Sequence, residues 1–173
     1  GGDYQARNIQ AVFQIFDVLK PEVSVSPENI ADGIRKTVIN TGLSGRWQVT
    51  GRDPLVICDT GHNREGLEYV VKQLMQTPGS ERHIVLGFVN DKDLDPVLPL
   101  FPKNAHYYFT KASVPRALDE NLLRDQAARY GLAGSAFPDV AAAVNAARSA
   151  AFRTDIIFIG GSTFVVADAL KDL

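Results

Sequence analysis

Four polar segments follow short apolar runs in this sequence, and they carry most of the side chains that could do chemistry. They are residues 59–63, 87–93, 110–113 and 160–163. Ligands of an open parallel sheet bind beyond the carboxyl ends of its strands, so these segments are the candidate site. An aspartate such as Asp59 can accept hydrogen bonds from sugar hydroxyls there, and a helix that starts there offers free N–H groups to an anion.

Each segment also has an interpretation without chemistry. Asp59 and Asn63 are residue types that cap helices. Lys92 either faces a phosphate or carboxylate, or belongs to a solvated charge cluster that caps a helix. Arg116, which we expect at a helix start, opposes the helix dipole and favours an anion nearby, or is simply exposed. The glycines before Ser162 allow close backbone approach, or only form a tight turn.

Standard metal, thiol and triphosphate motifs do not occur in this chain. His62, His83 and His106 are too scattered to indicate zinc, and His62 has no partner cysteine for a nucleophile pair. His62 either serves a reaction at the end of its strand or is hydrogen-bonded within its loop. Neither a G-x-x-x-x-G-K-[ST] sequence nor a G-x-G-x-x-G after a strand is present.

The elements that must position these side chains form an alternating pattern after residue 45. Runs rich in Val and Ile alternate with helical stretches, which predicts an α/β domain with a parallel sheet covered on both faces. The predicted strands are residues 47–50, 54–58, 83–88, 105–109 and 155–159, with a weaker one at 135–137. The predicted helices are residues 64–76, 94–100, 115–130, 140–152 and 163–170.

Two helices precede this domain. Apolar residues recur at helical spacing over residues 4–19, and Ser26 with Pro27 predicts the start of a second helix that runs to Gly42 and carries Val38 and Ile39 inward. Two helices alone make a poor domain, so we expect residues 1–44 to end a larger domain and its linker. Residues 45–173 then form the second domain.

The composition of the chain argues against nucleic-acid and membrane partners. The chain has 173 residues, 45% hydrophobic and 22% charged, with a formal net charge of -2, so a nucleic-acid partner is not favoured. Cys58 is the single cysteine and cannot form an internal disulfide. No apolar run approaches the roughly 20 residues that cross a bilayer. We therefore expect a cytoplasmic protein with no membrane partner.

Five short motifs occur in order along the chain. Residues 2–8 read G-D-Y-Q-A-R-N, and residues 45–48 read G-R-W-Q. Residues 59–63 read D-T-G-H-N, residues 91–93 read D-K-D, and Gly161 precedes Ser162. Together they resemble the folylpolyglutamate synthase and dihydrofolate synthase family of the Mur ligase superfamily, with Thr60 and Gly61 replacing the usual Gly and Ala of D-G-A-H-N.

The resemblance implies a fold and a reaction. The fold is a Rossmann-like, mostly parallel sheet with flanking helices, the Mur ligase carboxyl-terminal domain, preceded by two helices from the end of the central ATP-binding domain. The reaction joins L-glutamate to a pteroate or folate substrate: ATP phosphorylates the carboxylate, and the glutamate amine attacks the acyl phosphate. The P-loop and the Mg²⁺ ligands are expected upstream of Gly1, with no metal site in this segment.

The resemblance also implies roles for individual residues. Asn8, Arg46 and Asp59 are expected to contact ATP, Arg46 across the interface with the upstream ATPase domain. His62 is expected near the glutamate or the acyl phosphate as the catalytic residue. Lys92 and Ser162 are possible substrate or phosphate contacts.

Two other functions remain open at this point. A different Mur-type ligase that acts on a cell-wall precursor would share the fold and the ATP chemistry, although residues 4–8 and 59–63 favour the folate branch. A non-catalytic module that binds a nucleotide or anion is the other, although the two leading helices argue against an independent module. Dihydrofolate synthesis, polyglutamate elongation and a bifunctional enzyme are equally compatible with the sequence.

Overall fold

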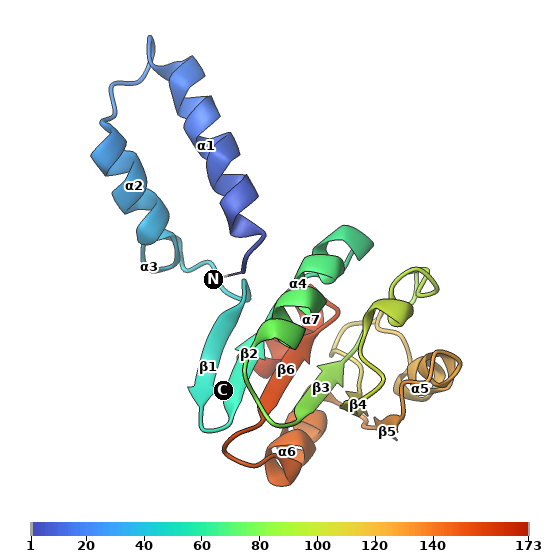
Figure 1. Ribbon diagram of the computed structural model, residues 1–173. Helices are drawn as coiled ribbons and strands as arrows, with labels where there is room; N and C mark the ends of the chain where they lie inside the picture. Colours follow the sequence, from blue (N-terminus) through green and yellow to red (C-terminus); the bar gives the residue numbers. More distant parts are fainter. Residues whose placement is uncertain (1, 173) are drawn as a thin grey trace. The chain divides into compact units, whose positions relative to one another are not determined.

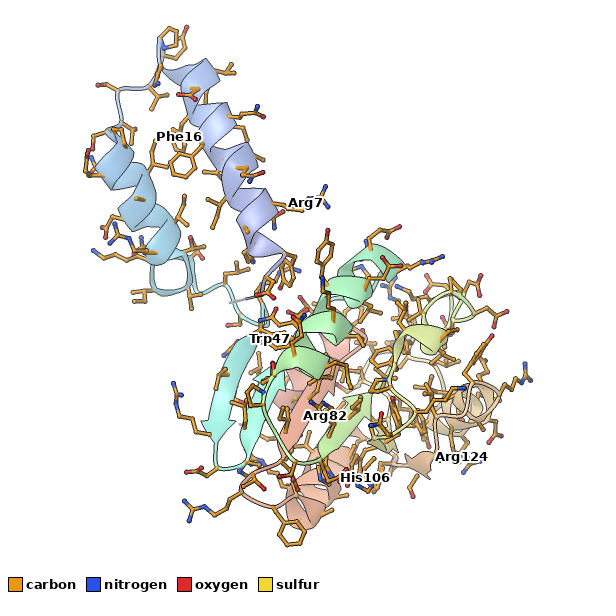
Figure 2. All side chains as sticks on the ribbon, in the orientation of Figure 1. Arg7, Phe16, Trp47, Arg82, His106 and Arg124 are labelled. Atoms are coloured by element: carbon orange, nitrogen blue, oxygen red, sulfur yellow. The ribbon has the colours of Figure 1, made fainter. Side chains whose placement is uncertain are left out.

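The computed structural model describes residues 2–172 and divides the chain into two compact units, Gly1–Ser44 and Gly45–Leu173. The first unit contains three helices: α1 (Gln5–Leu19), α2 (Pro27–Arg35) and α3 (Thr37–Thr41). Phe16 lies on the side of α1 that faces α2 (Figure 2). Ser26 caps α2 by accepting a hydrogen bond from the Asn29 amide at 3.2 Å, as the Ser-Pro pair predicts.

The prediction of a single helix from Pro27 to Gly42 is wrong. The helix breaks between α2 and α3, at Lys36. The Thr37 hydroxyl donates to the carbonyls of Gly33 and Ile34 at 3.0 and 2.9 Å, the local bonding by which threonine competes with regular helix. In this unit Val38 and Ile39 are exposed, not turned inward.

The second unit is built on one mixed sheet of six strands. The strands are β1 (Gln48–Arg52), β2 (Leu55–Cys58), β3 (Arg82–Leu86), β4 (His106–Phe109), β5 (Gly134–Ala136) and β6 (Ile156–Gly160). Their order is β1-β2-β6-β3-β4-β5, and every neighbouring pair is parallel except β1 with β2. The predicted α/β fold with a mostly parallel sheet is therefore confirmed.

Helices cover both faces of the sheet. They are α4 (Arg64–Gln76), α5 (Glu120–Ala128), α6 (Val140–Ala150) and α7 (Thr163–Ala169), with a 3₁₀ turn, η1 (Leu98–Leu100). On one face, α6 and α7 pack against alternate residues of the central strands, among them Val56, Cys58, Val85, Ile157 and Ile159. The other face is covered by α4 (Figure 1). This two-sided burial explains the continuous apolar runs of β2, β3 and β6.

Two predicted helices differ from the observed ones. Over residues 94–100 only η1 forms, because Pro96 and Pro99 lack the amide hydrogens that a helix needs. The helix predicted over 115–130 begins only at Glu120, where Asp119 caps it by accepting from the amides of Asn121 and Leu122 at 2.9 and 3.2 Å. Residues 114–118 are therefore free to make other contacts.

The connections of the sheet bring several loops to its carboxyl edge. The chain leaves β2 through α4 on one face and enters β6 from α6 on the other, with β6 lying between β2 and β3. Neighbouring crossovers thus lie on opposite faces, which separates the loops above the strands. The loops after β2, β6, β3 and β4 follow one another along this edge, in the order of the strands.

Candidate functional site

The carboxyl edge brings together the polar segments that the sequence singled out. Residues 59–63 follow β2, residues 161–163 follow β6, residues 87–93 follow β3 and residues 110–113 follow β4. Because these four strands are adjacent and parallel, their loops share one edge. Asn8 belongs to the other unit, on α1, where its side-chain amide donates to Gln5 Oε1 at 3.1 Å.

Asp59 is the buried centre of this edge. Its side chain is 0% exposed, and its two carboxylate oxygens accept hydrogen bonds from the Trp47 and Gly61 amides, each at 2.7 Å. Asp59 thus joins the segment before β1 to the segment after β2. It does not cap α4, since that cap is Asn63, whose Oδ1 accepts from the Gly66 amide at 3.0 Å.

The backbone around Arg46 is tightly constrained. Gly45 has φ +74° and Trp47 has φ +47°, a region in which a bulky residue such as tryptophan is strained. The Gly45 carbonyl accepts from the Thr60 amide at 2.8 Å, and a Cβ at Gly45 would lie 2.6 Å from Thr60 Cγ2. Arg46 itself is exposed. Its side chain therefore projects from a backbone that is fixed on both sides to residues 59–61.

His62 is exposed and presents a basic nitrogen. Its Nδ1 lies 3.1 Å from the Thr60 carbonyl oxygen, which can only accept a hydrogen bond. This contact favours the neutral tautomer that carries its proton on Nδ1. Nε2 is then the nitrogen that can accept a proton, at the carboxyl edge and immediately before α4.

Lys92 lies in the loop after β3 and interacts electrostatically with Glu65. The side chain is half-buried, and burial lowers the pKa of Lys92, against the opposing effect of Asp91 and Glu65. Glu65 belongs to the first turn of α4, so the charge of Lys92 acts on the start of that helix. The predicted alternative, a solvated charge cluster that caps a helix, is only half right: Asp91 and Asp93 are exposed, but no α-helix starts there, since the next element is η1.

Ser162 is buried and caps α7. Its hydroxyl oxygen accepts from the Phe164 amide at 3.2 Å. Gly161 before it has φ +89°, and a Cβ there would lie 2.8 Å from the Gly87 carbonyl oxygen. The glycine is therefore needed for close approach of the loops after β6 and β3, one of the two interpretations of this segment.

Two features of the edge were not predicted. Arg116 does not begin a helix; it lies in residues 114–118, which pair with the loop after β3. Lys111 and Glu120 form an ion pair, with Nζ 2.8 Å from Oε2 and Glu120 only 9% exposed. The sequence carried no signal for this pair, because Glu120 reads as an ordinary carboxylate within the helix predicted over 115–130.

Thiol and metal chemistry find no support in the described residues. Burial raises the pKa of Cys58 to about 11, so its thiol stays protonated. Among residues 2–172, no group of three His, Cys, Asp or Glu side chains is placed to hold a metal ion. Over the same residues, no helix has both the length and the apolar character to span a membrane.

Comparison with known proteins identifies one matching family and several related sequences. Residues 45–163 match the family described as Mur ligase, glutamate ligase domain. A Haloferax volcanii protein, "Probable bifunctional folylpolyglutamate synthase/dihydropteroate synthase", is 30% identical over 169 residues, which are 97% of this chain and 20% of that protein. The Escherichia coli dihydrofolate synthase/folylpolyglutamate synthase is 28% identical over 151 residues, 86% of this chain and 34% of that protein.

Solved structures agree on the fold. A bifunctional folylpolyglutamate synthase/dihydrofolate synthase with Mn, AMPPNP and L-glutamate bound matches with a TM-score of 0.74 and 28% identity, over 87% of this chain and 36% of that chain. The Mycobacterium tuberculosis folylpolyglutamate synthase complexed with ADP matches over 99% of this chain and 40% of its own, with a TM-score of 0.80 and 24% identity. This chain spans 20% to 40% of the length of these proteins.

Proposed function

The chain belongs to the Mur ligase glutamate ligase domain family, and from that premise we propose that it is the carboxyl-terminal part of an ATP-dependent ligase that adds L-glutamate to dihydropteroate or a folate. The observation that carries the proposal is the carboxyl edge, where the buried Asp59 ties the segments of Arg46 and His62 together and the loop that carries Lys92 follows β3 along the same edge. Relatives named as folylpolyglutamate and dihydrofolate synthases support the folate branch.

The proposed reaction has two steps. ATP supplies the γ-phosphoryl group that activates the substrate carboxylate. The glutamate amine then forms the amide bond, inorganic phosphate leaves and the amine loses a proton. Such a reaction depends on positioning and charge stabilisation more than on covalent help from the protein. The P-loop and Mg²⁺ ligands are assigned to the remainder of the longer protein: the sequence contains no P-loop motif, and residues 2–172 hold no group of three His, Cys, Asp or Glu side chains placed for a metal ion.

On the nucleotide side, Arg46 is the proposed phosphate contact. It is exposed, always charged, and its planar guanidinium suits bidentate contact with phosphate oxygens. Asp59 and Asn8 are proposed to contact the nucleoside. Asp59 is fully buried and accepts hydrogen bonds from the amides of Trp47 and Gly61. Its first task is to hold the Arg46 backbone in place.

On the amino-acid side, His62 and Lys92 are the proposed contacts. Nε2 of His62 is available to take the proton that the attacking amine loses. The ammonium group of Lys92 is available to pair with a carboxylate of glutamate, and its partial burial strengthens that attraction. Ser162 is proposed to bring the amino end of α7 to a phosphate or substrate oxygen.

The domain assignment is part of the proposal. Residues 1–44 are assigned to the last helices and linker of the ATP-binding domain, and residues 45–173 to the carboxyl-terminal domain. Apolar side chains such as Ile15, Val18 and Ile39 are exposed in the first unit, as expected of helices that pack against the rest of a larger domain.

Replacement of Arg46 by lysine tests the proposed function. Loss of one charged hydrogen bond costs about 1.5 to 3 kcal/mol, so we expect Arg46→Lys in the intact enzyme to lower kcat by about ten-fold or more. Because Arg46 is exposed, the melting temperature should change by less than about 2 °C. Arg153→Lys, an exposed arginine 3.4 Å from Asp53, is the control. Unchanged ATP kinetics together with a lower melting temperature would show Arg46 to be structural.

A further inference from the structure

Residues 113–118, here called the strap, pair with the loop after β3. Ala117 forms an antiparallel bridge with Val89. The Asn90 amide donates to the Arg116 carbonyl and the Leu118 amide donates to the Phe88 carbonyl, each at 2.9 Å. The strap thus fixes the backbone that leads into the 91–93 turn.

The other side of the strap is tied to α7. The amide and the hydroxyl of Ser113 both donate to the Asp168 carboxylate, at 2.7 and 2.9 Å. The Arg116 guanidinium carbon lies 5.1 Å from the centroid of the Phe164 ring, within the range of a cation–π contact. Phe164 is in the first turn of α7, two residues after Ser162.

Arg116 also contacts the turn that carries Lys92. Its Nη1 lies 3.8 Å from Asp91 Oδ2. The Arg116 guanidinium therefore contacts two neighbouring parts of the carboxyl edge. One is Asp91, in the loop after β3, and the other is Phe164, in the helix that follows β6. Both ends of the ion pair are largely exposed, with side chains 57% and 65% accessible. Exposed pairs of this kind contribute little to overall stability, so fold stability does not account for the arrangement.

We propose that Arg116 is a positioning residue for the amino-acid substrate, which acts by holding the 91–93 turn, and with it Lys92, in place at the carboxyl edge. The inference rests on the proposed function of Lys92. Arg116 orients the ammonium group through Asp91 and the strap and does not touch the substrate itself. Its loss lets the turn move, which weakens substrate binding before it affects chemistry.

The test is steady-state kinetics of the intact enzyme with glutamate varied. We expect Arg116→Ala to raise the glutamate KM by about five-fold, with kcat within about two-fold and a melting temperature within about 2 °C of wild type. Arg116→Lys, which keeps the charge but loses the planar fork, should recover part of the loss. Arg124→Ala is the matched control, a half-exposed arginine on α5 that pairs with Asp125, and should leave the KM unchanged.

A double-mutant cycle separates positioning from direct contact. If Arg116 acts through Lys92, Arg116→Ala should add almost nothing to the KM of a Lys92→Ala variant. A full additional increase overturns the proposal, as does an unchanged KM in Arg116→Ala when Lys92→Ala raises it. If Lys92→Ala itself leaves the glutamate KM unchanged, the assigned role of Lys92 fails, and the inference about Arg116 fails with it. Should Arg116→Ala be unfolded, the same cycle is run with Asp91→Asn.

Discussion

At the scale of single residues, Asp59 shows how a buried carboxylate organises an exposed site. It carries no contact with solvent, yet its carboxylate fixes the backbone directly after Arg46 and directly before His62. The strained φ of Trp47 persists because the surrounding contacts hold it. The rigidity needed by exposed functional side chains thus comes from a residue beneath them.

Replacement of Asp59 by asparagine tests this role. The side-chain amide has one acceptor oxygen, so either the Trp47 or the Gly61 amide is left facing an NH₂ group. A buried unpaired donor costs about 1 to 3 kcal/mol, and we expect the melting temperature of Asp59→Asn to fall by about 3 to 10 °C. Thermal unfolding followed by circular dichroism measures the shift, with exposed Asp125→Asn as the control. An unchanged melting temperature would show that the two amide bonds do not support the fold.

The candidate site was partly predictable at this scale. Asp59, His62, Lys92 and Ser162 follow strands directly, and the carboxyl ends of parallel strands must share an edge, so the sequence placed them on one side of the sheet. Arg116 was misplaced because its contacts depend on backbone pairing between two loops. Neither spacing nor residue type reveals such pairing.

At the scale of elements, the opposite edge of the sheet holds a buried polar network. His83 on β3 is 3% exposed; its Nδ1 lies 2.9 Å from Tyr108 Oη on β4, and its Nε2 lies 3.4 Å from Asp155 Oδ2 before β6. The His106 ring stacks on it at 4.9 Å between centroids. Figure 2 shows His106 at this edge, near Arg82 at the start of β3. The network links the starts of the three strands β6, β3 and β4.

This network predicts a loss of stability in mild acid. Burial lowers the pKa of His83, outweighing Asp155, which raises it; His106 lowers it further and Glu81 raises it. The unfolded chain, with an ordinary histidine pKa near about 6.5, therefore binds more protons than the native state as pH falls below that value. By linkage, the contribution of neutral His83 to stability is complete at pH 8 and is lost as the pH falls from about 6.5 through its lower native pKa.

Thermal unfolding between about pH 8 and pH 5.5 measures this loss. We expect the melting temperature of the wild-type protein to fall over this range and that of His83→Gln to fall less. His62→Gln, at an exposed histidine, should keep the wild-type slope. Equal slopes in the wild type and His83→Gln would mean that other groups cause the acid sensitivity.

Most elements were predictable because their patterns are local. The helix over residues 64–76 was predicted with the bounds of α4, since Asn63 caps it and its apolar residues repeat regularly. Three predicted helices had wrong bounds because a local feature interrupts or delays the helix. These features are the Thr37 hydroxyl, the prolines at 96 and 99, and the Asp119 cap. The antiparallel pairing of β1 with β2 was not predicted, because it depends on the short turn between the two strands.

At the scale of the whole molecule, the proposed function makes this chain one side of a composite site. It carries the Arg46, His62 and Lys92 edge but no P-loop sequence. We expect the 173-residue chain alone to form no amide from ATP, glutamate and dihydropteroate. Release of ADP and consumption of glutamate by the purified chain measure this, with the intact enzyme as the positive control. ATP-dependent glutamate ligation by the chain alone would contradict the division of labour.

The two borders of the sheet have a consequence for association between copies. At one border β1 has an irregular register between Val49 and Gly51, and at the other β5 is only three residues long, Gly134–Ala136. A strand from another molecule needs a long, regular row of unpaired amides and carbonyls on which to add. Neither border strand provides such a row, so the sheet is protected against edge-to-edge aggregation.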